Sequence, residues 1–419
     1  MMKKIILYLP VLFFLLLCSL PLYSGFRKDL KKVPPFFTQT EKNFKKKTTY
    51  TGTDFSIENE AEPPKQMYAK AYCLYDASTV RSLFGKNENE RLPMASTTKI
   101  MTCILALEKG KLSDKVTFSS YAASMPDVQL NAGKGDTFYL KDLLYSLMLE
   151  SHNDTAVAIA EHIGGSVEGF AKLMNEKAAF LGLKDTHFVT PNGLDAREHY
   201  TTAEELCKIA AYAIKNREFL KIIKTPFHAF TDCSGKKSCH ANSHNLFLSG
   251  YKGAIGIKTG YTGKAGYCFC GAAKRKGTTL ISAVLASGFP PHKTYKWSDT
   301  RKLMDYGFQN FRTCTISPIP LPEKISIYGS GKTTLSITCR LPEKLAFTLS
   351  KGDTVTHATE LPSHLAAPIR KGDIIGYEKY YQNDTLLYQF PVLAGENAKE
   401  RDYGYYREIL KKLFFQNIK

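Results

Sequence analysis

The sequence lacks the compositional bias that marks disordered or fibrous chains. Hydrophobic residues make up 43% of its 419 residues and charged residues 23%, which are ordinary values for a globular protein. Wholesale disorder and a collagen-like architecture are therefore excluded. The sequence also lacks a second long apolar run beyond residue 23, which excludes a protein that crosses a membrane several times.

Acidic residues are few relative to basic ones. The chain has 39 Asp and Glu against 57 Lys and Arg, a net charge of +18. Such a surplus is compatible with nucleic acid, an anionic membrane surface or an acidic polymer as partner, and composition does not choose between them. The chain length predicts two domains, with room for a third.

The one long apolar run lies at the N-terminus. Lys3 and Lys4 precede residues 5–23, which carry no charge, and this pattern is typical of a secretory signal or an uncleaved anchor. We therefore predict that residues 1–25 direct export. Leu22 matches poorly the small residue expected before a cleavage site, so the sequence leaves cleavage open.

Export allows some of the nine cysteines outside this segment to pair. Cys233 and Cys239 flank a turn-like stretch, which favours a hairpin disulfide. The alternative is a metal site that adds His240 and His244, but the spacing does not match the usual zinc patterns. We expect no metal.

The pattern along the chain predicts several regions. Residues 26–66 are polar and lysine-rich with little periodicity, as in a flexible basic linker. Residues 67–311 read as an α/β domain, with strands at 68–75, 267–273 and 280–285 around a block of helices. The predicted helices cover residues 96–110, 140–148, 170–181, 203–215 and 299–311.

The C-terminal part has a different character. Residues 312–397 contain short alternating segments punctuated by glycine, which predicts a small all-β domain. In residues 398–419, apolar side chains recur at helical spacing with basic side chains on the other face. This pattern favours an amphipathic helix on a membrane surface, and a helix packed on its own domain is the alternative.

Three short motifs carry the chemistry. They are Ser96-Thr97-Thr98-Lys99, Ser151-His152-Asn153 and Lys258-Thr259-Gly260. Each is weak alone, because Ser96 could be a helix cap and the others could be turn or strand residues. Together and in this order they are a strong signal.

The three motifs supply the parts of a nucleophilic site. A serine hydroxyl needs an adjacent base, and position i+3 of a helix brings the Lys99 amine over Ser96. Burial and a second cation, Lys258, would lower the pKa of Lys99 so that its amine is neutral. Ser151 would relay a proton to the leaving amine and Asn153 would hold a substrate amide. Lys258 and Thr259 would bind a carboxylate.

These motifs resemble those of the serine-type D-alanyl-D-alanine carboxypeptidases, the low-molecular-mass penicillin-binding proteins, which share S-x-x-K, S-x-N and K-T-G. The resemblance extends over residues 68–311 and includes 93–102, 142–154, 191–195 and 256–262. It implies a penicillin-binding fold, an antiparallel sheet flanked by helices, followed by a small β domain and an amphipathic helix.

The resemblance also implies a reaction. Ser96 attacks the penultimate D-Ala carbonyl of a peptidoglycan pentapeptide stem, Lys99 is the general base, terminal D-Ala leaves, and water hydrolyses the acyl-enzyme. The N–H groups of Ser96 and Tyr261 form the oxyanion hole, with Gly260 beside them in the third motif. β-Lactam antibiotics acylate Ser96. No metal or cofactor is implied, and the location is the periplasmic, extracytoplasmic face of a bacterial inner membrane.

The sequence departs from the family at several places. His152 stands where the family often has glycine. Some relatives bind the substrate carboxylate with an arginine about forty residues after the third motif. Here that region offers only Lys293 and Lys296 before Arg301, and a lysine cannot provide a bidentate contact.

Other functions remain as alternatives. A DD-endopeptidase would cleave crosslinked peptidoglycan with the same residues, and a β-lactam sensor or inert wall-binding protein would not turn over. A β-lactamase is disfavoured because no glutamate-bearing deacylation loop is identifiable. Nucleic acid is not expected, because it accounts for the net charge but for none of the motifs.

Overall fold

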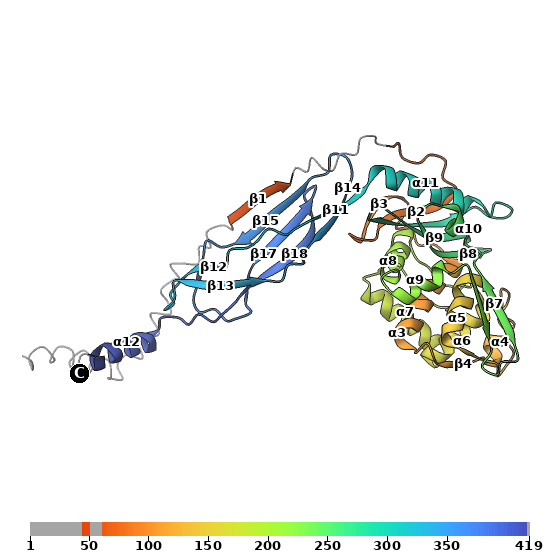
Figure 1. The fold of residues 1–419 in the computed structure, drawn as a ribbon, viewed down its shortest axis with the longest axis horizontal. Helices are drawn as coiled ribbons and strands as arrows, with labels where there is room; N and C mark the ends of the chain where they lie inside the picture. Colours follow the sequence, from red (N-terminus) through yellow and green to blue (C-terminus); the bar gives the residue numbers. More distant parts are fainter. Residues whose placement is uncertain (1–43, 51–60, 417–419) are drawn as a thin grey trace, which may run out of the picture. The chain divides into compact units, whose positions relative to one another are not determined.

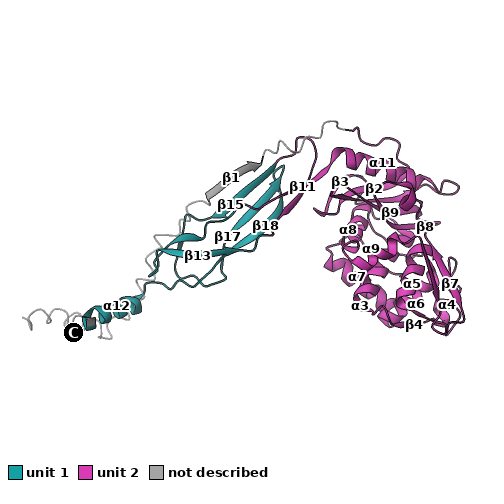
Figure 2. Cartoon of the chain, in the orientation of Figure 1, with its two compact units in different colours: residues 1–50, 319–341, 355–419 teal, residues 51–318, 342–354 magenta. Residues whose placement is uncertain are grey.

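The computed structural model describes residues 44–50 and 61–416, so the predicted export segment lies outside the described residues (Figure 1). The chain divides into two compact units (Figure 2). Unit 1 comprises residues 1–50, 319–341 and 355–419, and unit 2 comprises residues 51–318 and 342–354. The division falls near the predicted boundary at 311/312. It differs in placing residues 342–354 with the larger unit.

Unit 2 is built on a five-stranded antiparallel sheet in the order β3-β2-β10-β9-β8. Its first two strands form a hairpin, and its last three form a meander. Alternate residues of β2 face opposite sides, so Cys73 and Tyr75 join one core cluster and Tyr72 and Leu74 join the other. The strands are β2 (Ala69–Asp76), β3 (Arg81–Lys86), β8 (Ala254–Thr262), β9 (Gly266–Arg275) and β10 (Thr278–Ser287).

Helices cover both faces of this sheet. The long helix α11 (Tyr295–Asn310) packs on one face, and Phe247 of the short helix α10 (Leu246–Gly250) joins the core on that face. Helix α8 (Ala203–Ala213) packs on the other face with most of the other helices beyond it (Figure 1). All five predicted helices are present within a few residues of their expected bounds. The other helices are α3 (Lys99–Lys109), α4 (Ser120–Ala123), α5 (Leu140–Tyr145), α6 (Asn153–Gly164), α7 (Val167–Phe180) and α9 (Arg217–Lys224).

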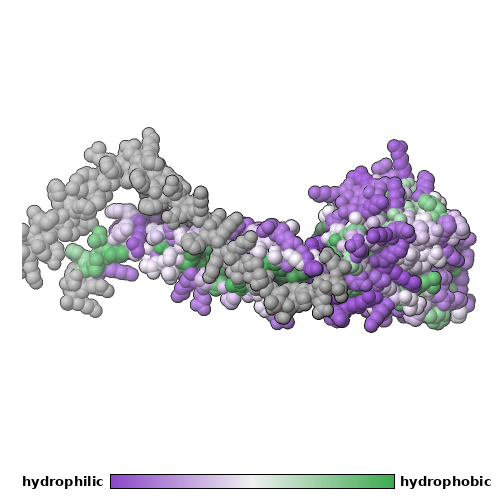
Figure 3. All heavy atoms as spheres, turned by 90° about the horizontal axis from the view of Figure 1, so that it is seen from above, coloured by the Kyte–Doolittle hydropathy of each residue, from purple (hydrophilic) through white to green (hydrophobic). Residues whose placement is uncertain are grey.

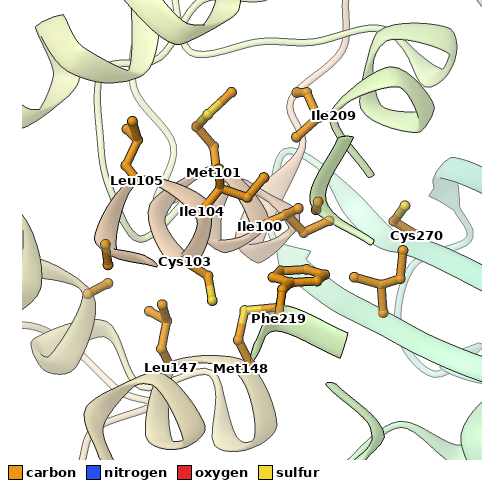
Figure 4. Close-up of a cluster of buried hydrophobic side chains, with 14 of the residues drawn as sticks. Ile100, Met101, Cys103, Ile104, Leu105, Leu147, Met148, Ile209, Phe219 and Cys270 are labelled. Atoms are coloured by element: carbon orange, nitrogen blue, oxygen red, sulfur yellow. The ribbon is translucent and has the colours of Figure 1, made fainter. Parts of the chain in front are cut away.

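Helix α3 runs through the centre of the larger core. Apolar residues almost all around its first two turns make it a buried helix, not a surface one. Figure 4 shows its side chains pointing toward those of the neighbouring helices and of β9. Because close packing resists displacement, this core fixes the start of α3, where the first motif lies. The residues in contact include Ile100, Cys103, Ile104, Leu147, Met148, Phe219 and Cys270.

Unit 1 contains a seven-stranded sheet in the order β1-β15-β17-β18-β13-β12-β16. The all-β expectation for the C-terminal region is therefore confirmed. The strands are β1 (Phe44–Tyr50), β12 (Lys324–Tyr328), β13 (Thr334–Cys339), β15 (Val355–Leu361), β16 (His364–Ala366), β17 (Ile374–Gln382) and β18 (Thr385–Ala394).

Two segments depart from the predicted organisation. Residues 44–50, expected within a flexible linker, form β1 and pair antiparallel with β15. Strand β14 (Leu345–Leu349), expected in the β domain, pairs with β11 (Arg312–Ile316), and both belong to unit 2. Sequence periodicity missed both pairings because main-chain hydrogen bonds between distant strands leave no local pattern.

The predicted C-terminal helix is α12 (Tyr403–Gln416). Its apolar side chains are exposed, from 37% for Ile409 to 68% for Phe415, and Figure 3 shows apolar atoms gathered over this end of unit 1. No helix in the described part of the chain is long and apolar enough to cross a membrane.

The expected hairpin disulfide is not formed. Cys239 lies on β7 (Ser238–Asn242) opposite Phe230 of β6 (Phe227–Thr231), whereas Cys233 lies in the turn beyond the last strand pair. The two cysteines are therefore not cross-strand neighbours, and both thiols are free. Among the described residues, no group of His, Cys, Asp or Glu is arranged to hold a metal ion.

Candidate active site

The first motif begins in a single 3₁₀ turn, η2 (Ala95–Thr98), that leads into α3. Two hydroxyls fasten this turn: Thr97 Oγ1 donates to the Met94 carbonyl at 2.6 Å and Thr98 Oγ1 donates to the Ala95 carbonyl at 2.8 Å. The half-buried Ser96 side chain therefore projects from a fixed backbone at the amino end of a helix, where the helix dipole favours negative charge.

Lys99 lies directly beneath Ser96, as the i+3 spacing predicts. Its Nζ is 2.8 Å from Ser96 Oγ, 2.8 Å from Asn153 Oδ1 and 2.7 Å from the Asn192 carbonyl oxygen. The side chain is fully buried. The Asn153 amide oxygen and the Asn192 carbonyl oxygen can only accept, so when the amine is neutral they would take its two hydrogens and leave its lone pair for the Ser96 hydroxyl.

Asn153 is held in the orientation that this contact requires. It is the first residue of α6, and its Nδ2 donates to the carbonyls of Pro126 and Asp127 at 3.1 Å each. Because both hydrogens of the amide are used on these carbonyls, Oδ1 must face Lys99. The Asn153 side chain thus contacts the base, in addition to the substrate-holding role expected from the sequence.

Burial lowers the pKa of both lysines. Desolvation is the main cause of a Lys99 pKa well below its ordinary value, the nearby Lys258 charge lowers it further, and Asp154 opposes these effects. Desolvation also lowers the pKa of Lys258, to about 7. Because the Lys258 ammonium lowers the pKa of Lys99 in turn, the structure supplies the arrangement that a lysine base requires.

The third motif lies on β8 beside the nucleophile. A Cβ atom added to Gly260 would lie 2.8 Å from the Ser96 backbone nitrogen and 3.0 Å from the Ala95 Cβ, so only glycine allows this approach. Lys258 is buried, and its Nζ donates to the Thr259 carbonyl at 3.0 Å. Thr259 is half-buried, and the Tyr261 ring is exposed against Tyr267. The structure therefore brings the first and third motifs together.

Ser151 is the predicted site residue with the least support from contacts. It has a left-handed backbone conformation, φ 72° and ψ 28°, in the sharp turn between the π-helical segment η3 (Ser146–Glu150) and α6. The side chain is half-buried, and in the described residues its hydroxyl makes no hydrogen bond. It is therefore free to rotate toward a ligand, which a proton relay needs.

Sequence reasoning missed the Asn192 carbonyl. This oxygen accepts from Lys99 and lies 3.4 Å from Ser96 Oγ. It is placed there because Thr102 Oγ1 donates to the Pro191 carbonyl at 2.6 Å, and because Gly193, at φ 85°, packs against the Ala95 carbonyl. A backbone carbonyl has no residue-type signal, and the Pro-Asn-Gly turn was the only trace of it in the sequence.

The second motif is tied to the β6–β7 hairpin by a contact that sequence reasoning also missed. Glu150 accepts from the Asn242 backbone N–H at 2.7 Å and pairs with His244 Nε2 at 2.5 Å. Although burial opposes ionisation, these hydrogen bonds lower the pKa of Glu150. Glu150 immediately precedes Ser151, so the hairpin helps to fix the turn.

Two residues that departed from the family pattern have structural partners. His152 is buried, and its Nδ1 is 2.8 Å from Ser146 Oγ. Lys296 Nζ donates to the Lys293 carbonyl at 2.7 Å and lies 4.5 Å from the centre of the Tyr267 ring. Burial lowers the pKa of Lys296 to about 8.

Known proteins with similar sequences belong to the family that the motifs resemble. Residues 57–288, more than half of the chain, match the model of the peptidase family described as D-alanyl-D-alanine carboxypeptidase, and residues 318–400 match that of the penicillin-binding protein 5 C-terminal domain. The carboxypeptidase DacF of Bacillus subtilis is 38% identical over 250 residues, 58% of this chain and 63% of its own length. A carboxypeptidase of Streptomyces sp. K15 is 37% identical over 246 residues, 55% of this chain and 84% of its own length.

Solved structures extend the likeness to the fold. Penicillin-binding protein 5 of Haemophilus influenzae aligns with a TM-score of 0.68 and 28% identity over 81% of this chain and 100% of its own. The Streptomyces K15 DD-transpeptidase aligns with a TM-score of 0.56 and 34% identity over 59% of this chain and 99% of its own. The predicted fold class is therefore confirmed, and the chain belongs to the serine-type D-alanyl-D-alanine carboxypeptidase family.

Proposed function

We propose that the protein is a serine D-alanyl-D-alanine carboxypeptidase that removes the terminal D-Ala from peptidoglycan pentapeptide stems. The observation that carries this proposal is the 2.8 Å contact between Lys99 Nζ and Ser96 Oγ inside a buried site with a second lysine. A hydroxyl at this distance from a neutral amine is an activated nucleophile. Family membership supplies the substrate class.

The acylation step follows from the contacts. Lys99 takes the proton of Ser96 as the oxygen attacks the carbonyl carbon of the penultimate D-Ala. The oxyanion is stabilised by the backbone N–H groups of Ser96 and Tyr261, which the close approach of Gly260 brings together. As the tetrahedral intermediate collapses, the terminal D-Ala amine receives a proton through Ser151 and leaves.

Substrate recognition relies on the third motif. The Lys258 ammonium has no carboxylate partner among the described residues, so its charge is available for the terminal carboxylate of the stem. Thr259 lies next to it and can donate a hydrogen bond. Asn153 Oδ1 accepts from Lys99 and has a second lone pair that can accept from a substrate N–H. Water then hydrolyses the acyl-enzyme. A β-lactam acylates the same serine, and the resulting acyl-enzyme is hydrolysed slowly.

The test uses the purified full-length protein, its Ser96→Ala variant and Ser249→Ala, which removes an exposed hydroxyl of α10 as a control. The protein is incubated with a fluorescent penicillin and with a pentapeptide ending in D-Ala-D-Ala. We expect one acyl group per molecule on Ser96 by intact mass, release of D-Ala, and loss of both only in Ser96→Ala. No label on folded protein would contradict the serine mechanism. Label without D-Ala release, but with cleavage of a crosslinked dimer, would identify an endopeptidase.

We also propose that the protein is exported and attached to the outer face of the membrane. The apolar run at residues 5–23 supports export, and the exposed apolar face of α12 supports attachment to the membrane surface. The paired substitution Ile409→Gln and Leu410→Gln, which removes apolar surface without changing the net charge, should reduce flotation with anionic vesicles. The control Lys411→Gln changes the polar face of the same helix. Equal flotation of the wild type and the paired variant would contradict this attachment.

A further inference from the structure

Unit 2 has a second concave feature that the peptidase reaction does not use. A cavity of about 500 Å³ lies at the turn between β9 and β10, bordered by the residues before β8 and by the end of α11. Gly253 on its wall has φ 78°, and a Cβ there would lie 2.4 Å from the Lys274 carbonyl, so glycine is required for this wall. About 23 Å of strand separate Gly253 from Gly260, so the cavity is distinct from the catalytic site.

The cavity is strongly cationic. One acidic side chain, Asp305, lines it; its carboxylate accepts from Tyr251 Oη at 2.7 Å and lies 3.9 Å from Arg275 Nη1. The ammonium groups of the lining residues Lys252, Lys274 and Lys276 form no ion pair with an acidic side chain among the described residues. The basic side chains that line it are Lys252, Lys274, Arg275, Lys276 and Arg312.

Both arginines are held in place before any ligand binds. Arg275 Nε donates to the Lys252 carbonyl at 3.0 Å, and the guanidinium lies 4.3 Å from the Tyr251 ring centre and 4.6 Å from that of Phe308. Arg312 donates to the Phe311 carbonyl at 2.9 Å and covers the carboxyl end of α11. A guanidinium fixed between rings loses little entropy on binding.

We propose that this cavity binds a phosphate or phosphodiester group. Several cations close together are expensive to maintain without an anion, and a pre-oriented guanidinium beside lysines is suited to tetrahedral oxyanions. A free phosphate and the headgroup of an anionic phospholipid share this chemistry. Five of the residues that line the cavity are basic, and its three lysines are exposed, so the cavity suits a charged group.

The test compares three full-length proteins. They are the wild type, a cavity variant (Lys252→Gln, Lys274→Gln and Lys276→Gln), and a control with the same change of net charge on exposed lysines elsewhere in unit 2 (Lys172→Gln, Lys184→Gln and Lys215→Gln). Pyrophosphate binding is measured by calorimetry. Flotation is measured with phosphatidylglycerol and with phosphatidylcholine vesicles. Penicillin labelling of Ser96 reports folding and the peptidase site independently.

We expect the cavity variant to bind pyrophosphate at least about tenfold more weakly than the wild type and the control, since each lost charge-assisted contact reduces affinity severalfold. A difference confined to phosphatidylglycerol vesicles would identify the lipid headgroup as the ligand. Equal pyrophosphate binding together with equal flotation of the cavity variant and the control, or a wild type that binds neither ligand, would overturn the proposal. Penicillin labelling should be equal in all three proteins.

Discussion

Gly260→Ala is the most direct test of how the third motif supports catalysis. In the structure, the added Cβ would lie 2.8 Å from Ser96 N, 3.0 Å from Ala95 Cβ and 3.1 Å from Thr97 N. Two of these atoms are backbone, and the turn that contains them is fastened to α3 and its core. Strand β8 and the turn η2 must therefore move apart.

The size of the effect follows from what that movement disrupts. The backbone N–H of Ser96 and that of Tyr261 must converge on one oxyanion, and loss of one such donor typically costs about 100- to 1,000-fold in rate. Displacement of a reacting group by about 1 Å costs about 100-fold. We therefore expect acylation by penicillin to slow by about 100-fold. Overpacking should also cost about 1–3 kcal/mol of unfolding free energy.

The assay is the second-order rate constant for acylation by a fluorescent penicillin. Gly263→Ala is the matched control, because a Cβ at Gly263 meets no atom within 4 Å. That variant should react at the wild-type rate. Thermal unfolding of both variants shows how much native protein is present at the assay temperature.

A wild-type acylation rate in folded Gly260→Ala would refute the reasoning. It would mean that the contact between β8 and the Ser96 backbone is not needed for the oxyanion hole. An equal loss of acylation rate in Gly263→Ala would also refute it. Any substitution near the end of β8 would then slow acylation, whether or not it disturbs the contact between Gly260 and the Ser96 backbone.

Three further variants probe other parts of the structure. For the wild-type enzyme, kcat/KM should fall as pH rises above about 7, because Lys258 loses the charge that binds the substrate carboxylate. The variant Lys258→Arg stays charged, so its kcat/KM should not fall over this pH range. Asn153→Ala should lower acylation by about 10-fold or more, because Lys99 loses an orienting acceptor, as a stopped-flow measurement would show. His357→Ala should lower the unfolding free energy of the β unit by about 3 kcal/mol in a denaturant titration, because it leaves the buried Glu378 carboxylate without its partner. An unchanged pH profile in Lys258→Arg, an unchanged acylation rate in Asn153→Ala, or an unchanged denaturation midpoint in His357→Ala would contradict the corresponding argument.

Local sequence was sufficient for most of the secondary structure. The apolar repeat of α3 and the alternation of β2 and of strands β12 to β15 are properties of neighbouring residues, so they could be read without the fold. The segment 44–50 could not be read in this way. Its strand is defined by hydrogen bonds to β15, about 300 residues away in the sequence, and the lysine-rich stretch resembles any solvated linker.

The sequence by itself determined that the Lys99 amine lies beside the Ser96 hydroxyl, because the two residues are one helical turn apart and that spacing is local. It also identified Lys258 and Asn153 by residue type and motif. Only the tertiary structure decided what surrounds them: the Asn192 carbonyl that accepts from Lys99, and the approach of Gly260 to Ser96. The pKa of Lys99 depends on burial and on the nearby Lys258 charge, and both arise when distant segments pack together, so no local pattern encodes them.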